Sequence, residues 1–206
     1  MAFISDEQTL LISFGLVLTA MVPFFYRFER KQLTARELVL IALLAAIAAV
    51  SRVPFAALPN VQPTSFVIMM TGLVFGAETG FIVGATAALV SNVFLGQGPW
   101  TPWQMFGWGL MGLMTGLLKH SWLLKGQYGR MVYGFCWGFL FDWIMNMWFI
   151  LGVMKDFTWA VVLSAFVTSF YFDLAHALSN VFFIAVFAVG WVKVLQRFKV
   201  KYGLLN

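Results

Sequence analysis

The chain has 206 residues, of which 62% are hydrophobic and only 10% are charged. A soluble domain is about 45 to 50% apolar, so this composition predicts an all-α integral membrane protein and leaves no room for a soluble catalytic domain. The net charge of +5 does not indicate nucleic-acid binding, because the basic residues gather in particular loops.

Apolar stretches between charged residues or Gly/Pro breaks predict seven membrane-spanning helices. In chain order they cover residues 9–26, 37–53, 63–77, 79–95, 103–118, 131–152 and 172–195. The first stretch lacks a basic flank and a cleavage pattern, so it is expected to remain in the protein. Residues 157–171 are apolar but short, and we expect a partly inserted or interfacial helix that leads into the last span.

The distribution of basic residues predicts the orientation. Arg52 and Lys155 fall on one side of the seven-span arrangement, and the other eleven fall on the opposite side: Arg27, Arg30, Lys31, Arg36, Lys119, Lys125, Arg130, Lys193, Arg197, Lys199 and Lys201. The bias of Lys and Arg toward the cytoplasm predicts a multi-pass plasma-membrane protein with an external amino terminus and a cytoplasmic carboxyl terminus. Residues 54–62, 96–102 and 152–157 are then external, and Glu78 is expected to be hydrated in a cytoplasmic turn.

Small residues follow helical spacing in the second span. Ala42 lies four residues before Ala46, and Ala45 lies four before Ala49. In lipid, small residues let helices approach closely, so the stripe indicates either packing inside the protein or docking to a separate membrane subunit, and the spacing alone leaves both open. Further small residues at 72, 76, 80, 84, 112 and 116 indicate internal helix contacts.

Two Gly/Pro-broken loops carry amides and indoles toward the predicted external face. Pro59 and Pro63 bracket the first loop and predict an extended connection, whereas Gly96, Gly98 and two prolines break the second. Amides suit a neutral ligand with several hydrogen-bonding groups, and tryptophans beside them suit ring stacking, although they are also common at membrane interfaces. The candidate binding residues in these loops are Asn60, Gln62, Gln97, Trp100, Trp103 and Gln104.

The sixth and seventh spans carry polar residues at helical spacing. Asp142 and Asn146 are four residues apart, and Asp173, His176 and Asn180 share one helix face. Ionisable groups at membrane depth are costly and are expected to face the interior or an aqueous cavity, where they are candidates for ligand contacts. A structural pairing, such as Asp173 with His176 within one helix turn, is the alternative.

Motifs for catalysis are missing from the sequence. His120 and His176 are its only histidines, and it contains no HExxH, GxSxG or P-loop motif. We therefore expect no enzyme activity, no cofactor and no metal site, and any ATP hydrolysis must belong to a partner.

The alanine stripe, the Pro-Asn-Val-Gln-Pro loop, the glycine-spaced turn at 72–84 and the segment Gly-Gln-Gly-Pro-Trp-Thr-Pro-Trp-Gln-Met resemble the substrate-binding S components of energy-coupling factor (ECF) transporters. The resemblance covers about residues 36–195 and is greatest to the cobalamin-type S components. It implies a six-helix vitamin-binding core, residues 32–206, to which residues 1–31 add an extra transmembrane helix and a basic linker.

The resemblance also implies partners and roles. A transmembrane coupling subunit and two cytoplasmic ATPases would drive the import of a vitamin, with cobalamin favoured. Ala42, Ala45, Ala46 and Ala49 would dock the coupling subunit, while the polar and indole residues named above would line an external site. The core would then reorient in the bilayer to release the vitamin.

Two other functions stay open from the sequence. A proton-coupled secondary carrier would use Asp142, Asp173 and His176 as a proton relay and would transport without partners. A non-transporting membrane scaffold would bind no vitamin.

Overall fold

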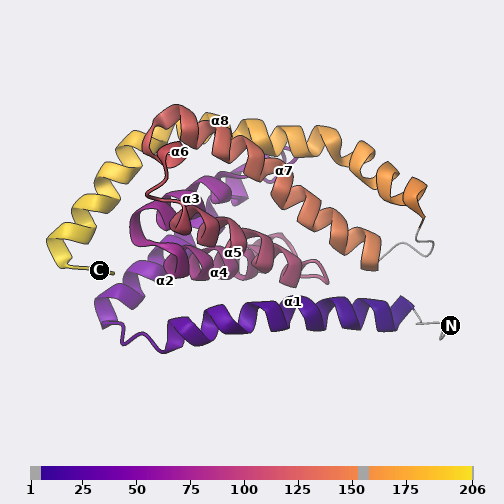
Figure 1. Cartoon of the computed structure of the whole chain (residues 1–206), viewed down its shortest axis with the longest axis horizontal. Helices are drawn as coiled ribbons and strands as arrows, with labels where there is room; N and C mark the ends of the chain where they lie inside the picture. The colour runs from indigo at the N-terminus through magenta and orange to yellow at the C-terminus, as the bar shows by residue number, and fades with distance from the viewer. Residues whose placement is uncertain (1–5, 153–157, 206) are drawn as a thin grey trace.

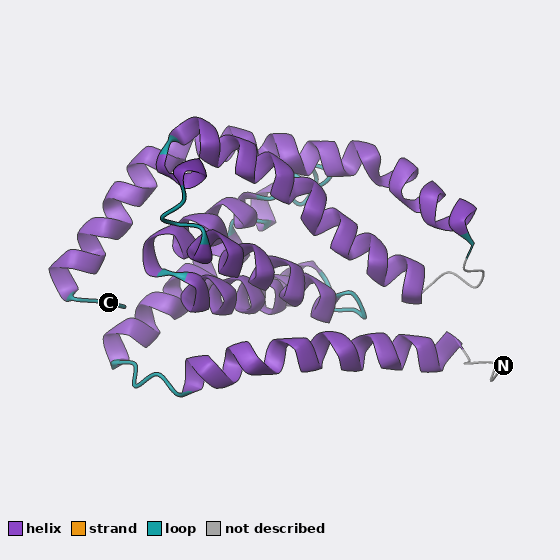
Figure 2. Ribbon diagram, in the orientation of Figure 1, coloured by secondary structure: helices purple, strands orange, loops and turns teal. Residues whose placement is uncertain are grey.

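The computed structural model describes residues 6–152 and 158–205, so Lys155 and the turn that carries it lie outside the described residues. Every regular element in the described ranges is a helix, which confirms the all-α class (Figure 2). The elements are α1 (Asp6–Glu29), α2 (Ala35–Val50), the 3-10 turn η1 (Val53–Phe55), α3 (Pro63–Phe75), α4 (Ala77–Leu95), α5 (Thr101–Leu117), α6 (Trp122–Lys125), α7 (Gln127–Gly152) and α8 (Trp159–Tyr202).

The start of α1 and the end of α8 lie at opposite ends of the molecule (Figure 1). The end of α7 and the start of α8 lie at the same end as the amino terminus, whereas the connection from α1 to α2 lies near the carboxyl terminus. Among the described residues, α1, α2, α4, α7 and α8 are long and apolar enough to cross a membrane. The shorter α3 lies in the interior, where 12 of its 13 residues are buried.

Glycine lets α4 and α5 pack with their backbones in contact. A Cβ atom on Gly112 would collide with the backbone of Gly80, and one on Gly84 would collide with the carbonyl of Trp108. These contacts agree with the internal role that their spacing predicted, and they hold the middle and the last part of α5 against the first half of α4.

Replacing Gly112 by Ala is therefore expected to force α4 and α5 apart. Because the atoms that a Cβ would meet belong to backbone, no side-chain rotation relieves the clash, and we expect a loss of about 3 kcal/mol of stability. The midpoint of thermal unfolding in detergent measures it. Gly190→Ala is the control, since nothing lies within 4 Å of its added Cβ; equal midpoints for the two variants would contradict the packing argument.

Glu78 is not the hydrated turn residue that the sequence predicted. It lies in the first turn of α4, and its carboxylate pairs with Arg27 at 3.1 Å and with Lys31. The Glu78 side chain is only 18% exposed. Phe24 stacks on Phe81 nearby, with ring centroids 4.5 Å apart. These contacts attach the extra amino-terminal helix to α4.

The last helix is longer than predicted. Residues 157–171 were expected to form a separate interfacial helix, but Thr158 caps a single helix of 44 residues that continues to Tyr202. At 1.5 Å per residue α8 is about 66 Å long, roughly twice the hydrocarbon thickness of a bilayer. It bends over the outside of the bundle (Figure 1). The polar residues of its middle part interrupt the apolar pattern without interrupting the helix, and His176 and Asn180 bond to other helices there, whereas Asp173 bonds to Ser169 of α8 itself.

Candidate functional site

The connection from α2 to α3 brings the first group of candidate residues toward the interior. It was predicted to be extended, but it folds into η1 and a series of turns before Pro63 starts α3. Asn60 adopts the left-handed region with φ of 55°, which Asn tolerates better than most residues. This conformation accompanies a side chain that bonds to α7 and α8.

One chain of hydrogen bonds runs from this loop into the core. Asn60 Nδ2 donates to Asp142 Oδ2 at 2.9 Å, and the same oxygen lies 3.1 Å from His176 Nδ1. His176 Nε2 lies 2.7 Å from Ser65 Oγ, which also accepts a bond from Trp108 Nε1 at 3.1 Å. A neutral imidazole satisfies every donor here if Ser65 donates to Nε2 and Nδ1 donates to Asp142. The chain joins the loop to α3, α5, α7 and α8.

A second chain begins at Arg52, just after α2. Its guanidinium donates to Gln62 Oε1 at 3.1 Å, to Ser91 Oγ at 2.6 Å and to Asn92 Oδ1 at 3.2 Å. It also lies over the Trp108 ring, 4.8 Å from the centroid. Since Gln62 Nε2 donates to Asn60 Oδ1 at 3.2 Å, Arg52 connects to the first chain. The cation is thus held by neutral oxygens and an indole face.

Asn92 extends these contacts to the second loop. Its Nδ2 donates to Gln104 Oε1 at 2.7 Å and to Thr101 Oγ1 at 3.0 Å, and Thr101 in turn donates to Gln97 Oε1 at 3.0 Å. The two predicted loops therefore join in one assembly, which we call the outer polar network. It consists of Arg52, Asn60, Gln62, Ser65, Ser91, Asn92, Gln97, Thr101, Gln104, Trp108, Asp142 and His176.

Three candidate residues lie beside the network and join α7 to α8. Asn146 Nδ2 donates to Ser169 Oγ at 2.8 Å, and Ser169 donates to Asp173 Oδ2 at 3.2 Å. Asn180 Nδ2 donates to the carbonyl of Gly134 at 2.9 Å. No bond between Asp173 and His176 is present in the described residues; His176 instead pairs with Asp142 on the neighbouring helix.

The candidate tryptophans differ in their surroundings. Trp103 is buried at 9% exposure, whereas Trp100 is half-buried and packs edge to face on Trp148 with centroids 5.7 Å apart. The indole nitrogens of Trp103 and Trp148 are buried and have no hydrogen-bond partner among the described residues. These indoles join the start of α5 to the end of α7.

Two cavities border this region. One of about 390 Å³ lies under the η1 loop and is lined by Arg52, Asn60 and Gln62. The other, of about 680 Å³, lies between α7 and α8, where Asp173 meets aromatic side chains that include Trp143 and Phe170. Ligand sites of about 300 to 1,000 Å³ with mostly apolar walls and a few polar groups are typical for small molecules. The predicted single chamber is not seen in the described residues, because the candidate side chains bond to one another, and the larger cavity opens on the outer surface of α7 and α8, where Trp143, Phe170 and Tyr171 are exposed.

Ser65, His176 and Asp142 have the order of groups found in Ser-His-Asp hydrolases. Ser65 and His176 are completely buried, and Ser65 Oγ already accepts the Trp108 bond. A substrate therefore has no direct access to the hydroxyl. The arrangement connects helices in the core and does not supply a reactive nucleophile.

Sequence reasoning did not select several residues of the network. Arg52 was used only to predict orientation, and Ser65, Ser91, Asn92 and Thr101 resemble the small polar residues common in membrane helices. One signal in the sequence could have identified Arg52. It is a cation on the side of the membrane opposite the basic loops and lies next to a Gly/Pro-broken loop, where a buried charge needs a partner or a function.

The predicted docking stripe is divided by the packing of α2. Ala45 and Ala49 are buried at 2% and 0% exposure, on the side where α2 packs against α3 and α4. Ala42 and Ala46 are exposed. Internal packing therefore explains Ala45 and Ala49, and docking to a partner stays a prediction that only Ala42 and Ala46 are exposed to serve.

An all-helical membrane bundle with a polar network enclosed near one end has the form of a membrane-embedded solute-binding protein. Residues 32–197 match the family model described as the ECF-type riboflavin transporter, S component. This range covers most of the chain, so the protein belongs to that family of transporter subunits. Helix α1 lies outside the matched range.

Curated relatives give a narrower comparison. UPF0397 proteins of Aliivibrio fischeri (strain MJ11) and Aliivibrio salmonicida (strain LFI1238) are each 30% identical over 90 residues, which are 41% of this chain and 49% of each relative. A UPF0397 protein of Vibrio atlanticus (strain LGP32) is 30% identical over 89 residues, 41% of this chain and 48% of the relative. The match thus spans about half the length of these relatives. No solved structure matches the chain.

Proposed function

We propose that the protein is the vitamin-capturing subunit of an ECF-type importer and that the outer polar network, with its two cavities, is the capture site. The observation that carries the proposal is the convergence of six candidate residues from both loops, α7 and α8 into one hydrogen-bonded network, namely Asn60, Gln62, Gln97, Gln104, Asp142 and His176. The positive-inside pattern supports an external position for this site, with the amino terminus outside.

Unpaired polar atoms support a solute at this site. Asp173 Oδ1, Asn180 Oδ1 and Trp103 Nε1 are buried and have no hydrogen-bond partner among the described residues. An unsatisfied buried polar group costs about 1 to 3 kcal/mol. A bound vitamin with several donors and acceptors would recover part of that cost, which supports capture of a ligand over a scaffold role.

Two vitamins are candidates for the ligand, and a different observation supports each of them. Riboflavin follows from the description of the matched family, and the 390 and 680 Å³ cavities are of a size suited to a molecule of that class. Cobalamin follows from the resemblance of the Gly-Gln-Gly-Pro-Trp-Thr-Pro-Trp-Gln segment, and its amide arms would pair with the amides of the network. The larger corrin requires the η1 loop to move aside.

Equilibrium binding of purified protein to a vitamin panel that includes both candidates tests the proposal. We expect saturable binding of one vitamin with a Kd in the nanomolar to micromolar range, and mass spectrometry of material that copurifies with the protein should identify the same compound. Absence of binding to every member of the panel, by protein that unfolds cooperatively, would contradict the proposal.

The import mechanism proposed here needs partners. The chain has no nucleotide-binding motif, so a transmembrane coupling subunit and two ATPases would supply the energy, as in ECF importers. The rival secondary carrier requires a proton path through Asp142, Asp173 and His176. On the inner side that path leads to the buried Ser65 and Trp108, and Asp173 bonds to Ser169 and not to His176 or Asp142 in the described residues. Proteoliposomes that contain the chain alone should bind vitamin without accumulating it, even under an imposed pH gradient. Accumulation would favour the carrier.

A further inference from the structure

A cavity of about 590 Å³ lies at the end of the bundle opposite the outer polar network. It is enclosed by the ends of α3 and α5, the region from α6 to the start of α7, and the last part of α8. The positive-inside pattern places it at the cytoplasmic membrane surface. The capture function proposed above uses none of its residues.

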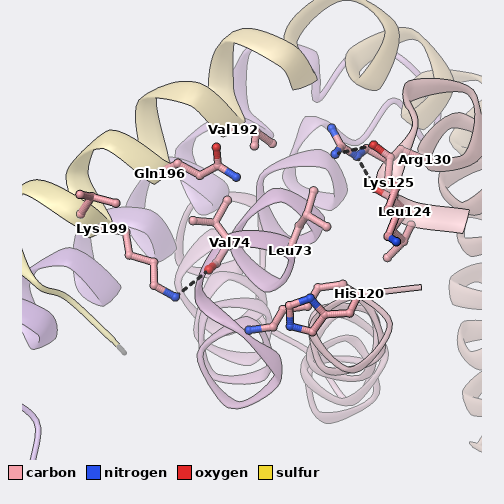
Figure 3. A pocket seen from close by; sticks show the side chains of 11 residues that line it. Leu73, Val74, His120, Leu124, Lys125, Arg130, Val192, Gln196 and Lys199 are labelled. Carbon is pink, nitrogen blue, oxygen red and sulfur yellow. Dashed lines mark hydrogen bonds between the residues drawn. The ribbon is translucent and has the colours of Figure 1, made fainter. Parts of the chain in front are cut away.

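Cations surround this cavity. Lys119, Lys125, Arg130 and Lys199 line it, and His120 lies at its edge. Figure 3 shows Lys199 and Arg130 on opposite sides, extending from different helices. Among the described residues no acidic side chain lines the cavity, and none of these four cations forms an ion pair. Two acidic side chains are engaged with other groups, since Glu78 binds Arg27 and Lys31, and Glu37 binds Thr34 and the backbone of Leu205.

Structural roles account for only part of this charge. Lys199 donates to the carbonyl of Val74 at 3.2 Å, near the end of α3, and Arg130 donates to the carbonyl of Leu124 at 2.7 Å. Cations at helix carboxyl ends are favourable. No hydrogen bond is present for the Lys119 and Lys125 side chains in the described part of the chain, so their charges are not explained by capping.

Apart from the Gln196 side chain, the remaining wall of the cavity is apolar. Leu73, Val74, Leu124 and Val192 form it, and Leu124 is almost completely buried at 1% exposure. A ring of cations above an apolar floor suits a ligand that has an anionic head and a hydrocarbon part. Basic pockets between helices on the cytoplasmic side are sites where anionic phospholipid head groups bind.

We propose that this basic cavity binds the phosphate group of an anionic phospholipid from the cytoplasmic leaflet. The phosphate accepts hydrogen bonds from the lysines and Arg130, while the start of the acyl region lies against the apolar floor. A soluble phosphate compound shares the head-group chemistry but gains nothing from the floor.

Native mass spectrometry of the full chain in detergent tests this assignment. We titrate it with phosphatidylglycerol, and in parallel with phosphatidylcholine that has the same acyl chains. We expect phosphatidylglycerol to bind at least about tenfold more tightly, since each basic residue near an anionic head group contributes about 1 kcal/mol. Equal binding of the two lipids would overturn the proposal.

Variants then locate the site. Lys119→Gln with Lys125→Gln removes two charges that hold no structural hydrogen bond in the described residues, and it should reduce phosphatidylglycerol affinity about tenfold or more. The matched control is Lys193→Gln with Lys201→Gln, which removes two exposed charges of α8 that do not line the cavity. We expect less than a twofold change in phosphatidylglycerol affinity for the control. Equal losses of affinity in both double variants would show that the lipid responds to the overall positive charge of this surface and would overturn the proposed site.

Competition by soluble phosphate compounds distinguishes a lipid head group from a free phosphate as the ligand. Inorganic phosphate and glycerol 3-phosphate at millimolar concentration are expected not to displace the lipid. Displacement by either compound, lost in the Lys119 and Lys125 variant, would overturn the lipid assignment in favour of a soluble anion. Vitamin binding, measured on the same samples, should be unchanged, so failure of this proposal and failure of the proposed function are distinguishable.

Discussion

Replacing Arg52 by Ala is expected to weaken vitamin binding by about 100-fold or more while leaving a folded protein. The change removes the donors to Gln62, Ser91 and Asn92 and the contact with the Trp108 ring. Hydrogen bonds that involve a charged group contribute about 1.5 to 3 kcal/mol each. Without them the η1 loop loses its tie to α4, and the Gln62 side chain loses its orientation toward Asn60.

Binding titrations of purified variants measure this effect, with the thermal midpoint as the check on folding. Arg52→Lys is the matched control, because it keeps the charge but cannot form the planar fork that reaches three oxygens at once. It should retain an intermediate affinity. Ser91→Ala removes a single bond and should cost less than about tenfold. If the Arg52→Ala protein binds within twofold of the unaltered chain, the capture site is not organised by this residue.

Replacing Ala46 by Trp is expected to abolish vitamin uptake in cells that express the whole importer, with binding to the isolated chain preserved. Ala46 is exposed on α2, whose small side chains would allow another helix to approach closely. An indole at that position prevents the close approach that coupling requires. Uptake of labelled vitamin and binding by the purified variant are the two measurements.

Two controls separate docking from folding. Leu140→Trp places an indole on α7, an exposed position that is a similar distance along its helix, and it should leave uptake near the unaltered level. Ala49→Trp places the indole inside the bundle, where Ala49 is 0% exposed, and it should reduce the amount of folded protein itself. Full uptake by the Ala46→Trp importer would remove α2 from the coupling surface.

The approximate positions of α1 to α5, α7 and α8 were predictable from apolar runs and Gly/Pro breaks, although only five of these described helices are long and apolar enough to cross a membrane. Even the short α3 was found, since Pro63 and Gly76 mark its ends. The continuity of α8 was not predictable from this pattern. Asp173 and His176 make its middle polar, and only the neighbouring α7, with Asp142, shows why a helix tolerates them there.

The sequence indicated several polar residues that the structure joins in one network, but it did not indicate how they pair. Asn60 and Asp142 are 82 positions apart, and their contact depends on how the η1 loop folds over α7. Similarly, the sequence indicates that Asp173 and His176 share a helix face, but it does not indicate that His176 pairs with another helix. Periodicity identifies which side of a helix faces inward, whereas the partner on that side depends on tertiary packing.

The unbroken backbone of α8 connects the two ends of the molecule. Asp173 lies beside the outer polar network and Lys199 lines the basic cavity, and the 26 residues between them correspond to about 39 Å of helix. Because the helix is continuous, a displacement of the part near Asp173 is transmitted along its backbone to the part that carries Lys199. Closure around a captured solute would therefore change the spacing of the cations that line the basic cavity. A ligand bound at one end of α8 would, in turn, change how easily the helix moves at its other end.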